Sequence, residues 1–577
     1  MYTNHKSALY VVAKLKQQGI CHIVISPGNS HNPMVRSIDE DSFFKTYSIT
    51  DERSAAFFAI GIAQAVQAPV AIMCTSGTAT CNYISGVTEA FRRNIPLVVI
   101  TADKHPYFLN QLEDQMINQP VLFKEITKYA TTIPEIIDKK DDWYCQRVLS
   151  EAFLEMNHHG TGPIHINVPI SYGMHAIGDS FTTEALPLMS RIDRFDRKTS
   201  DSDWENLFAS IADKRILFLC GQDISFSSRT QELLELVSQR FNCVLASVPI
   251  SNLHTRHAVS IELINFRIDD YLPDIVITLN GSCTSDFKYK LKDTNKQFEH
   301  WLVHEQGKVA DPYRKLRYVM EFDTETFLSI MAQYGTDDST SEYFHECRRL
   351  ESMFSVPEMP YSITYACQHV LSQLPQNSIL HLGNSSTIRI AHYFDINPNI
   401  RVFCNRGVNG IDGCMSTFVG HASCTEEPAF LLIGDLTFFY DMNALWNRYL
   451  KNNMRIMLFN NSGASLFHFG QGLNNFPTLN NNVAAEHHTT AKGWVESLGF
   501  KYLSSSNQTQ FENALPIFVS PESDAPILFE VFTDKETDAK TWHSIIEKQN
   551  PPEPPAPRQG FGIKTKLKEL INKHITK

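Results

Sequence analysis

"GDLTFFYDMNALWNRYLKNNMRIMLFNNSG", which runs from Gly434 to Gly463, decides the fold of this chain. The apolar run "PAFLLI" comes directly before it and ends at Gly434-Asp435, and a second apolar run, "MRIMLF", ends at Asn460-Asn461. We expect the residues between the two runs to form a crossover helix. Apolar strands joined in this way pair in parallel, so their carboxyl ends emerge at the same edge of a sheet. The sequence therefore predicts an α/β fold in which Asp435 and Asn461 lie close together at that edge.

Similar strand-and-turn units recur along the rest of the chain. In the first block, apolar runs such as "CHIVISPG" (21–28), "APVAIMCTSG" (68–77) and "IPLVVITAD" (95–103) alternate with helical patterns. Runs of the same kind occur between residues 215 and 281 and again from residue 378. Strands alternating with helices of this length indicate βαβ units and parallel sheets. We predict an α/β protein with three doubly wound parallel-sheet domains.

The composition narrows the class of protein. The chain has 577 residues and a formal net charge of −12, which argues against a nucleic-acid partner because no overall positive field exists to release phosphate counterions. No run approaches the roughly 18 apolar residues of a membrane span, and the amino terminus has the pattern of an amphipathic helix, not of an export signal. Twelve cysteines occur, none in a C-x-x-C pair, which favours reduced and buried thiols. We expect a cytoplasmic protein without a transmembrane segment.

The last thirty residues differ from the rest. "NPPEPPAP" (550–557) is too rich in proline for a helix or a sheet and should be extended. The following segment, "IKTKLKELINKHITK" (563–577), places its apolar residues on one helical face among five lysines. Two interpretations stay open: a solvated helix at the terminus, or a helix that docks to a partner or to an anionic membrane surface.

The residues at the ends of the two strands that opened this section suit a divalent cation. The side chains of Asp435 and Asn461 are hard oxygen ligands, and the backbone carbonyl of Gly463 can complete the protein's share of a Mg²⁺ (or Mn²⁺) site. Magnesium usually takes few protein oxygens and fills its octahedron with water and phosphate oxygens. Gly434 allows the backbone to approach such phosphates closely. His487-His488, at the start of a predicted helix, lack a third ligand, and we assign them no metal role.

Gly434-Asp435 followed by Asn460-Asn461 at this spacing resembles the cofactor signature of thiamine-diphosphate enzymes. "YSITDERSAAFFAIGIAQA" (47–65) in turn resembles the segment that carries the catalytic glutamate of that superfamily, which would be Glu52. The resemblance implies that Glu52 acts on the N1′ atom of the cofactor's aminopyrimidine, which then removes the C2 proton. The alternative is that the Asp51-Glu52 pair only opens a helix, where acidic side chains suit the helix dipole.

A narrower resemblance covers residues 8 to 530. "ISPGN", "DERSAAFFAIGIA", "CTSGTATCNY", "PLVVITADK", "DQMINQP", "NRGVNGIDG" and "GDL", in this order, are similar to the MenD family, the synthases of 2-succinyl-5-enolpyruvyl-6-hydroxy-3-cyclohexene-1-carboxylate in menaquinone biosynthesis. The resemblance implies that 2-oxoglutarate is decarboxylated on thiamine diphosphate and that the succinyl carbanion is transferred to isochorismate. It also implies a homodimer or homotetramer with active sites between subunits, because Glu52 of one subunit must meet Asp435 of another.

The family's architecture can be carried over to this chain. It implies a pyrimidine-binding domain at residues 1–185, a central Rossmann-like domain at 195–340, and a diphosphate-binding domain at 355–545. Residues 548–577 are then left as the proline-rich linker and the basic tail helix.

The family's donor-substrate and cofactor positions are matched in this sequence. The resemblance implies that Ser385 and Arg389 hold the distal carboxylate of the fragment derived from 2-oxoglutarate, and that Arg406 is a further substrate arginine. Ile411 would wedge the cofactor into its bent shape, and Gln115 would lie near the reacting centre. The remaining expected contacts are the apolar pair Leu466 and Phe467 and the cofactor-binding positions Gly77, Gly434 and Leu436.

The acceptor-substrate positions depart from the family pattern. The family loop reads S-P-G-S-R-S-T-P-L, whereas this chain has Ser26-Pro-Gly-Asn29-Ser30-His31-Asn-Pro-Met34, so Ser30 stands in place of an arginine. Lys104 replaces a second arginine and loses its bidentate fork, and Asp114 replaces an asparagine. Each lost charged hydrogen bond costs about 1.5–3 kcal/mol. The chain is therefore either a divergent menaquinone-pathway synthase or a paralogue that uses a different acceptor.

Two other functions remain as alternatives. One is a simple 2-oxo-acid decarboxylase or an acetohydroxyacid-synthase-like ligase, and the other is a non-catalytic paralogue that only binds the cofactor. An enzyme acting on pyruvate needs no clamp for a distal carboxylate, so Ser385 and Arg389 argue against the first. The presence of Glu52, Asp435 and Asn461 argues against the second.

Overall fold

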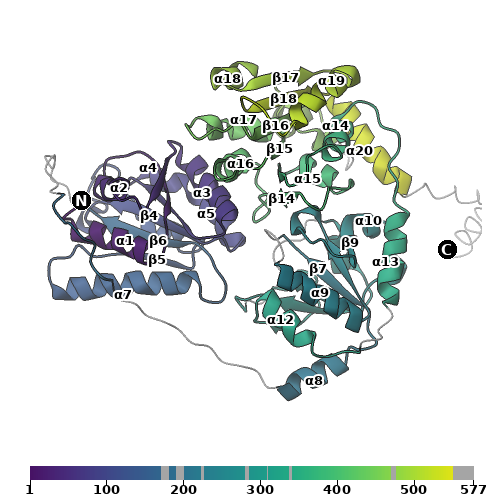
Figure 1. Ribbon diagram of the computed structural model, residues 1–577, viewed down its shortest axis with the longest axis horizontal. Helices are drawn as coiled ribbons and strands as arrows, with labels where there is room; N and C mark the ends of the chain where they lie inside the picture. The colour runs from purple at the N-terminus through teal and green to yellow at the C-terminus, as the bar shows by residue number, and fades with distance from the viewer. Residues whose placement is uncertain are drawn as a thin grey trace, which may run out of the picture.

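The protein is built from three six-stranded sheets that follow one another along the chain (Figure 1). The structure is a computed structural model and describes residues 1–170, 181–189, 201–222, 227–279, 285–307, 310–336, 341–468 and 476–549. Within these ranges, every pair of neighbouring strands in the three sheets is parallel. The predicted α/β fold class is therefore confirmed. The proposed tail helix at 563–577 lies outside the described residues.

The first sheet has the strand order β2-β1-β3-β4-β6-β5. Its strands are β1 (His22–Ile25), β2 (Lys45–Ser48), β3 (Val70–Cys74), β4 (Leu97–Asp103), β5 (Tyr129–Thr132) and β6 (Ile164–Pro169). One face packs against α1 (Lys6–Gln17), α2 (Asn32–Asp39) and α7 (Lys139–Met156). The other face packs against α3 (Glu52–Val66), α4 (Thr78–Asn82), α5 (Ile84–Arg92) and α6 (Gln119–Phe123). Helices on both faces explain why the inner strands are almost continuously apolar.

The third sheet repeats this arrangement. Its order, β14-β13-β15-β16-β18-β17, is the order of the first sheet when each set of strands is numbered from one. The strands are β13 (Ile379–Leu382), β14 (Arg401–Phe403), β15 (Ala429–Gly434), β16 (Met454–Asn460), β17 (Lys501–Ser505) and β18 (Ile527–Phe532). The helices are α14 (Ile363–Leu371), α15 (Ser386–Ala391), α16 (Cys414–Ser423), α17 (Asp435–Tyr440), α18 (Lys492–Ser497), α19 (Gln508–Val519) and α20 (Lys535–Gln549). Two short 3₁₀ helices, η4 (Met442–Leu445) and η5 (Ser465–His468), and one π-helical turn, η7 (Leu479–Val483), complete this unit.

The second sheet has a different order, β12-β11-β10-β7-β8-β9, which is that of a Rossmann-like sheet. Its strands are β7 (Ile216–Cys220), β8 (Cys243–Ser247), β9 (Ala258–Ser260), β10 (Ile275–Leu279), β11 (Glu299–Val303) and β12 (Leu316–Met320). Its helices are α8 (Asp201–Ala209), α9 (Ser228–Arg240), α10 (Ile261–Asn265), α11 (Phe287–Asp293), α12 (Thr324–Met331) and α13 (Glu342–Ser352). The short turns outside the third sheet are η1 (Pro106–Phe108), η2 (Pro249–Ser251) and η3 (Asp269–Tyr271).

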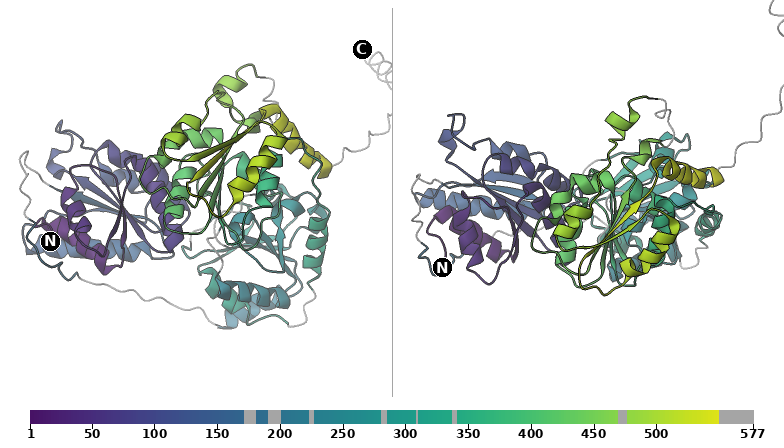
Figure 2. Two further views of the ribbon diagram at one scale, coloured as in Figure 1. Left: turned by 45° about the horizontal axis from the view of Figure 1, so that its top comes forward. Right: turned by 90° about the horizontal axis from the view of Figure 1, so that it is seen from above.

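The first and third sheet units meet through α3 and α16, which lie side by side in both views of Figure 2 and share one hydrophobic core. Two glycines allow the helix backbones to touch. A Cβ atom on Gly61 would lie 2.1 Å from the carbonyl oxygen of Thr417, and one on Gly420 would lie 2.1 Å from that of Phe58. No larger side chain fits at either crossing point, so the two helices pack in a fixed register.

The crossover between β15 and β16 differs from the single helix that we expected. Helix α17 ends at Tyr440 and the short turn η4 follows it. The buried carboxylate of Asp441 accepts hydrogen bonds from the backbone N–H and the hydroxyl of Ser416 on α16, both at 2.7 Å, and so ends the helix at this point. Side chains that bond to nearby backbone, such as Asn447 to the carbonyl of Ala444, further favour turns. In the described ranges, no helix has both the length and the apolar character needed to cross a membrane.

Candidate active site

The carboxyl ends of β15 and β16 form one corner of the third sheet, as the sequence predicts. The strands pair with Gly434 opposite Phe459, and Asp435 begins α17 directly after β15. The Oδ2 atom of Asp435 accepts hydrogen bonds from the backbone N–H groups of Asn461 at 3.1 Å and of Gly463 at 3.0 Å. Its Oδ1 atom accepts from the N–H of Leu436 at 2.6 Å. The buried carboxylate is therefore held rigidly beside the two other predicted metal ligands.

A second carboxylate fixes the amide of Asn461. The side-chain Nδ2 of Asn461 donates to Oδ2 of Asp538 at 2.8 Å, which leaves the amide oxygen of Asn461 without a hydrogen bond in the described part of the chain. Asp538, on α20, is 1% exposed and also accepts from the N–H of Ile363 and the hydroxyl of Thr533. Burial raises its pKa to about 6, against the opposing effect of these donors. Sequence reasoning missed Asp538, because nothing distinguishes it from the other acidic residues that begin this helix.

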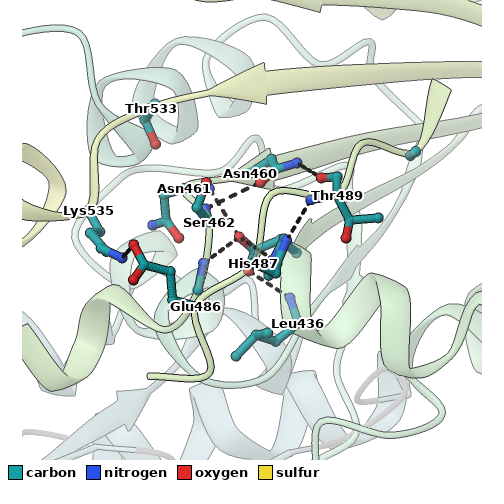
Figure 3. Close-up of polar contacts among 12 residues, drawn as sticks. Leu436, Asn460, Asn461, Ser462, Glu486, His487, Thr489, Thr533 and Lys535 are labelled. Atoms are coloured by element: carbon teal, nitrogen blue, oxygen red, sulfur yellow. Dashed lines mark hydrogen bonds and ion pairs between the residues drawn. The ribbon is translucent and has the colours of Figure 1, made fainter. Parts of the chain in front are cut away.

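A histidine that received no role from the sequence lies at the same corner (Figure 3). The Nε2 atom of His487 is 3.3 Å from Oδ2 of Asp435. The segment that carries His487 folds over the turn after β16, where its own backbone N–H donates to the carbonyl of Ser462 at 3.3 Å. His487 was invisible to the spacing argument because it is not at a strand end.

The loop between β13 and α15 gathers the predicted donor-substrate residues. Ser385 has a φ of +71°, a left-handed conformation that is strained for a residue with a side chain. Its carbonyl accepts from Nη1 of Arg389 at 2.9 Å. The buried Arg406 donates to Oδ1 of Asn384 at 2.8 Å, and Asn384 in turn donates to the carbonyl of Gly410. Ser385, Arg389 and Arg406 therefore lie together beside the loop that contains Ile411.

This cluster is electropositive. Burial lowers the pKa of Arg406, and the nearby guanidinium of Arg389 adds to that effect. Burial together with Arg406 and Arg389 also lowers the pKa of His392 to about 3, so its imidazole is neutral at physiological pH. The second sheet unit contributes Glu262, whose pKa burial raises to about 7 in spite of Arg389. An incoming carboxylate would relieve the repulsion between the guanidinium groups of Arg389 and Arg406.

At the start of α3, Asp51 and Glu52 have different partners, although the sequence alone could not distinguish their roles. Asp51 caps the helix, since its side chain accepts from the N–H groups of Arg53 and Ser54 at 2.9 and 3.3 Å. Glu52 takes no part in that cap. Its Oε2 accepts from Nδ2 of Asn82 at 3.0 Å, which leaves Oε1 available to a ligand.

The carboxyl edge of the first sheet places Gly77 against Gln115. Gly77 has a φ of +80°, and a Cβ atom there would lie 3.1 Å from the backbone of Gln115, which itself has a positive φ of 53°. The fully buried side chain of Gln119 accepts from the N–H of Gly77 at 2.8 Å and donates to the carbonyl of Ala102 and to Asn167. Gln119, which the sequence did not single out, therefore holds the Gly77 loop to the ends of β4 and β6.

The predicted acceptor residues lie on neighbouring loops of the same edge. Asn29 is exposed and Ser30 partly buried, whereas His31 is fully buried and burial lowers its pKa to about 4. Lys104 forms an ion pair with Glu113 at 2.5 Å and donates to the backbone carbonyl of Asp114 at 2.7 Å. The charge of Lys104 is therefore already engaged within its own loop.

Comparison with known proteins identifies the family. Residues 5–121 match the family described as "Thiamine pyrophosphate enzyme, N-terminal TPP binding domain". The chain is 37% identical over 549 residues to the 2-succinyl-5-enolpyruvyl-6-hydroxy-3-cyclohexene-1-carboxylate synthase of Phocaeicola vulgatus. The aligned residues cover 93% of this chain and 97% of that protein. The chain belongs to this synthase family. Synthases of the same name from Bacteroides thetaiotaomicron (37% over 563 residues, 95% and 100% of the two chains) and Flavobacterium johnsoniae (31% over 548 residues, 92% and 97%) are also similar.

In this member of the synthase family, the two halves of the predicted site share no direct hydrogen bond or ion pair within the described part of one chain. Among the described residues, no hydrogen bond or ion pair links Glu52 to Asp435, Asn461 or Gly463. The start of α3 instead contacts the far end of α17, where Arg53 donates to the carbonyl of Tyr440 at 2.8 Å. Leu466 and Phe467 lie on η5, directly after the Asp435 corner.

Proposed function

We propose that this chain is a transferase dependent on thiamine diphosphate and Mg²⁺ (or Mn²⁺) that decarboxylates 2-oxoglutarate and joins the succinyl fragment to an acceptor. Its similarity to the named synthases along more than nine-tenths of the chain supports this proposal. The observation that carries it is the corner at which Asp435, Asn461 and Gly463 meet. We assign the pyrimidine-binding role to residues 1–185, the central role to 195–340 and the diphosphate-binding role to 355–545.

The residues at the corner fit a hard cation and a diphosphate. The carboxylate of Asp435 and the amide oxygen of Asn461, which Asp538 leaves free, are donors of the kind that Mg²⁺ prefers. In the described ranges, no three His, Cys, Asp or Glu side chains are arranged to hold a metal, so a cation here would take further oxygens from its ligand. Gly434 has open space where a Cβ would stand, which leaves room for phosphate oxygens.

Each cluster of residues then has a chemical task. When bound, thiamine diphosphate supplies a carbon nucleophile and an electron sink. Glu52 would hold and release a proton at Oε1, because Oε2 is engaged by Asn82. Ser385 and Arg389 would bind the distal carboxylate of 2-oxoglutarate, the arginine through a charge-assisted hydrogen bond, and Arg406 would be a further substrate-binding arginine. The apolar pair Leu466 and Phe467 would help to exclude water from the reacting carbon.

The acceptor is either isochorismate or a different molecule. Ser30 offers only a hydroxyl where the family pattern has an arginine, and the charge of Lys104 is neutralised by Glu113. An anionic acceptor would have to break that ion pair in order to recruit Lys104. We propose that the affinity for isochorismate is low unless another subunit supplies a cation.

We propose that the active enzyme is a homodimer or homotetramer with its sites between subunits. Among the described residues of one chain, Glu52 makes no direct hydrogen bond or ion pair with the Asp435 corner, and the segment from Tyr107 to Leu122 exposes large apolar side chains of the kind that interfaces cover. These side chains are Tyr107, Phe108, Leu112, Val121 and Leu122. Light scattering should give at least a dimer. Mixing inactive Glu52→Gln and Asp435→Ala chains should restore activity if the two residues act from different subunits.

The deciding experiment measures CO₂ release from 2-oxoglutarate with Mg²⁺ and thiamine diphosphate, with and without isochorismate. Product formation from isochorismate would establish the synthase, and turnover of the donor without its capture would establish a different acceptor. Equal turnover of pyruvate would favour a simple 2-oxo-acid decarboxylase or an acetohydroxyacid-synthase-like ligase. Absence of turnover in a wild-type protein that binds the cofactor would favour a non-catalytic paralogue, and full activity of Glu52→Gln would refute the proposed role of that residue.

A further inference from the structure

The segment that carries His487 is anchored on both sides of the Asp435 corner. Glu486 forms an ion pair with Lys535 of α20 at 2.6 Å, and the carbonyl of Thr489 accepts from Nδ2 of Asn460 at 2.9 Å. The imidazole ring also packs edge-on against Phe439 of α17, with ring centroids 5.3 Å apart. These contacts fix the position of the His487 ring.

The two ring nitrogens of His487 have different partners. The backbone N–H of Thr489 points at Nδ1 from 3.2 Å, and because that group can only donate, Nδ1 accepts. A neutral ring therefore carries its proton on Nε2. The Nε2 atom is buried and lies 3.3 Å from Oδ2 of Asp435, but it has no aligned hydrogen bond among the described residues. It is a fixed donor at the edge of the cation corner, and the described residues give it no aligned acceptor.

We propose that His487 is a phosphate-binding residue of this site, and that its Nε2–H donates to an anionic oxygen of the diphosphate. This inference rests on the proposed function, because it assumes that a diphosphate binds beside Asp435. The carboxylate oxygen nearest to the ring already accepts two backbone N–H groups, from Asn461 and Gly463, so it offers Nε2 little free lone-pair density. A phosphate oxygen is the acceptor that the site lacks.

The competing interpretation is that His487 is a ligand of the metal. A separation of 3.3 Å from Asp435 is compatible with two ligands of one cation. However, a metal needs the lone pair of Nε2, and in the neutral ring that position holds the proton, because Thr489 occupies the lone pair of Nδ1. The hydrogen bond at Nδ1 therefore makes His487 a donor to the anion and not a ligand of the cation.

The first test compares His487→Phe with His488→Phe. Phenylalanine keeps the ring that packs on Phe439 but has no donor, and the exposed Thr489 can replace its lost partner with water. His488 is exposed and serves as the matched control. In isothermal titrations with Mg²⁺ present, we expect His487→Phe to raise the Kd of thiamine diphosphate and that of inorganic pyrophosphate by the same factor, about tenfold or more. His488→Phe should change neither Kd, and His487→Gln, which restores an N–H donor, should recover most of the loss.

The second test needs no variant. With Mn²⁺ in place of Mg²⁺, electron spin echo measurements on the wild-type protein with bound pyrophosphate should show phosphorus coupling to the metal but no directly coordinated histidine nitrogen. A coordinated nitrogen would overturn the inference in favour of a metal ligand. Unchanged pyrophosphate affinity in a folded His487→Phe protein would overturn it as well. If the wild-type protein binds no thiamine diphosphate, the proposed function fails first, whereas failure of the inference alone leaves wild-type binding intact.

Discussion

Asp538→Asn changes a single buried atom and is expected to turn the amide of Asn461 around. In the wild-type protein, Asp538 accepts three hydrogen bonds, from Asn461, Thr533 and the N–H of Ile363. An asparagine that keeps its oxygen on the N–H of Ile363 presents an NH₂ group to Asn461. Two NH₂ groups cannot pair, so the amide of Asn461 flips and offers its own oxygen to residue 538. Its NH₂ group then faces the position proposed for the cation.

The magnitude follows from the number of ligands. Three protein oxygens are proposed to bind the cation, and the flip replaces one of them with a donor group that repels it. Loss of one charge-assisted contact costs about 1.5–3 kcal/mol, which corresponds to a rise in the Kd of Mg²⁺ of about 10-fold to 160-fold. The free energy of unfolding should change less, because the buried Asp538 already has a raised pKa and its neutral replacement removes a desolvated charge.

The assay is an isothermal calorimetric titration with Mg²⁺ at saturating thiamine diphosphate. The matched control is Asp534→Asn, because Asp534 lies one helical turn earlier, is exposed, and caps α20 by accepting from the N–H and the hydroxyl of Thr537. The control should bind Mg²⁺ like the wild-type protein. A Kd for Asp538→Asn within twofold of the wild-type value would refute the argument that this carboxylate orients Asn461.

Three further changes test the scaffold around the site. Gly61→Ala places a Cβ 2.1 Å from a backbone oxygen, so we expect it to lower the midpoint of thermal unfolding. The control is Gly493→Ala, whose added Cβ would have no atom within 4 Å and which should leave the midpoint unchanged or raise it slightly. Burial raises the pKa of Asp441 to about 7, whereas in the unfolded chain this carboxyl loses its proton at about pH 4. The free energy of unfolding should therefore fall as the pH rises between these two values, and Asp441→Asn should flatten this pH dependence when it is measured by urea unfolding. Gln119→Met removes the partner of the buried N–H of Gly77, and we expect weaker binding of thiamine diphosphate in fluorescence titrations, by about tenfold, together with a lower thermal midpoint. An unshifted midpoint in Gly61→Ala, an unchanged pH slope in Asp441→Asn, or wild-type cofactor affinity in Gln119→Met would each contradict its prediction.

The buried strands could be predicted from the sequence, whereas strands with mixed exposure could not. Strands such as β3 and β4 are buried at every position and therefore appear as continuous apolar runs. The strands missed include the edge strands β2, β5 and β17, whose residues are mostly partly or fully exposed. Their sequences, "KTYS", "YATT" and "KYLSS", lack an apolar pattern because only one neighbouring strand and part of a helix layer cover them.

The same distinction holds for the candidate site. Asp435 and Asn461 could be located because each follows a strand end, and parallel topology brings such ends together. Asp538 and His487 reach the same corner from a helix and from a loop, 77 and 26 residues after Asn461. Their proximity depends on tertiary packing that no local spacing encodes. Gln119 was missed for a related reason, since its hydrogen-bond partners lie on three separate segments.

The paired glycines at the crossing of α3 and α16 also restrict how the molecule can open. Axial slip of either helix by one residue would bring a side chain such as Ile60 or Ile62 against the backbone of the other, so shear between the first and third sheet units is blocked. We therefore expect these two units to move together. Room for substrates of different size would then have to come from the loops at the carboxyl edges of the sheets. A change of acceptor specificity would alter those loops and leave the packed units that carry Glu52 undisturbed.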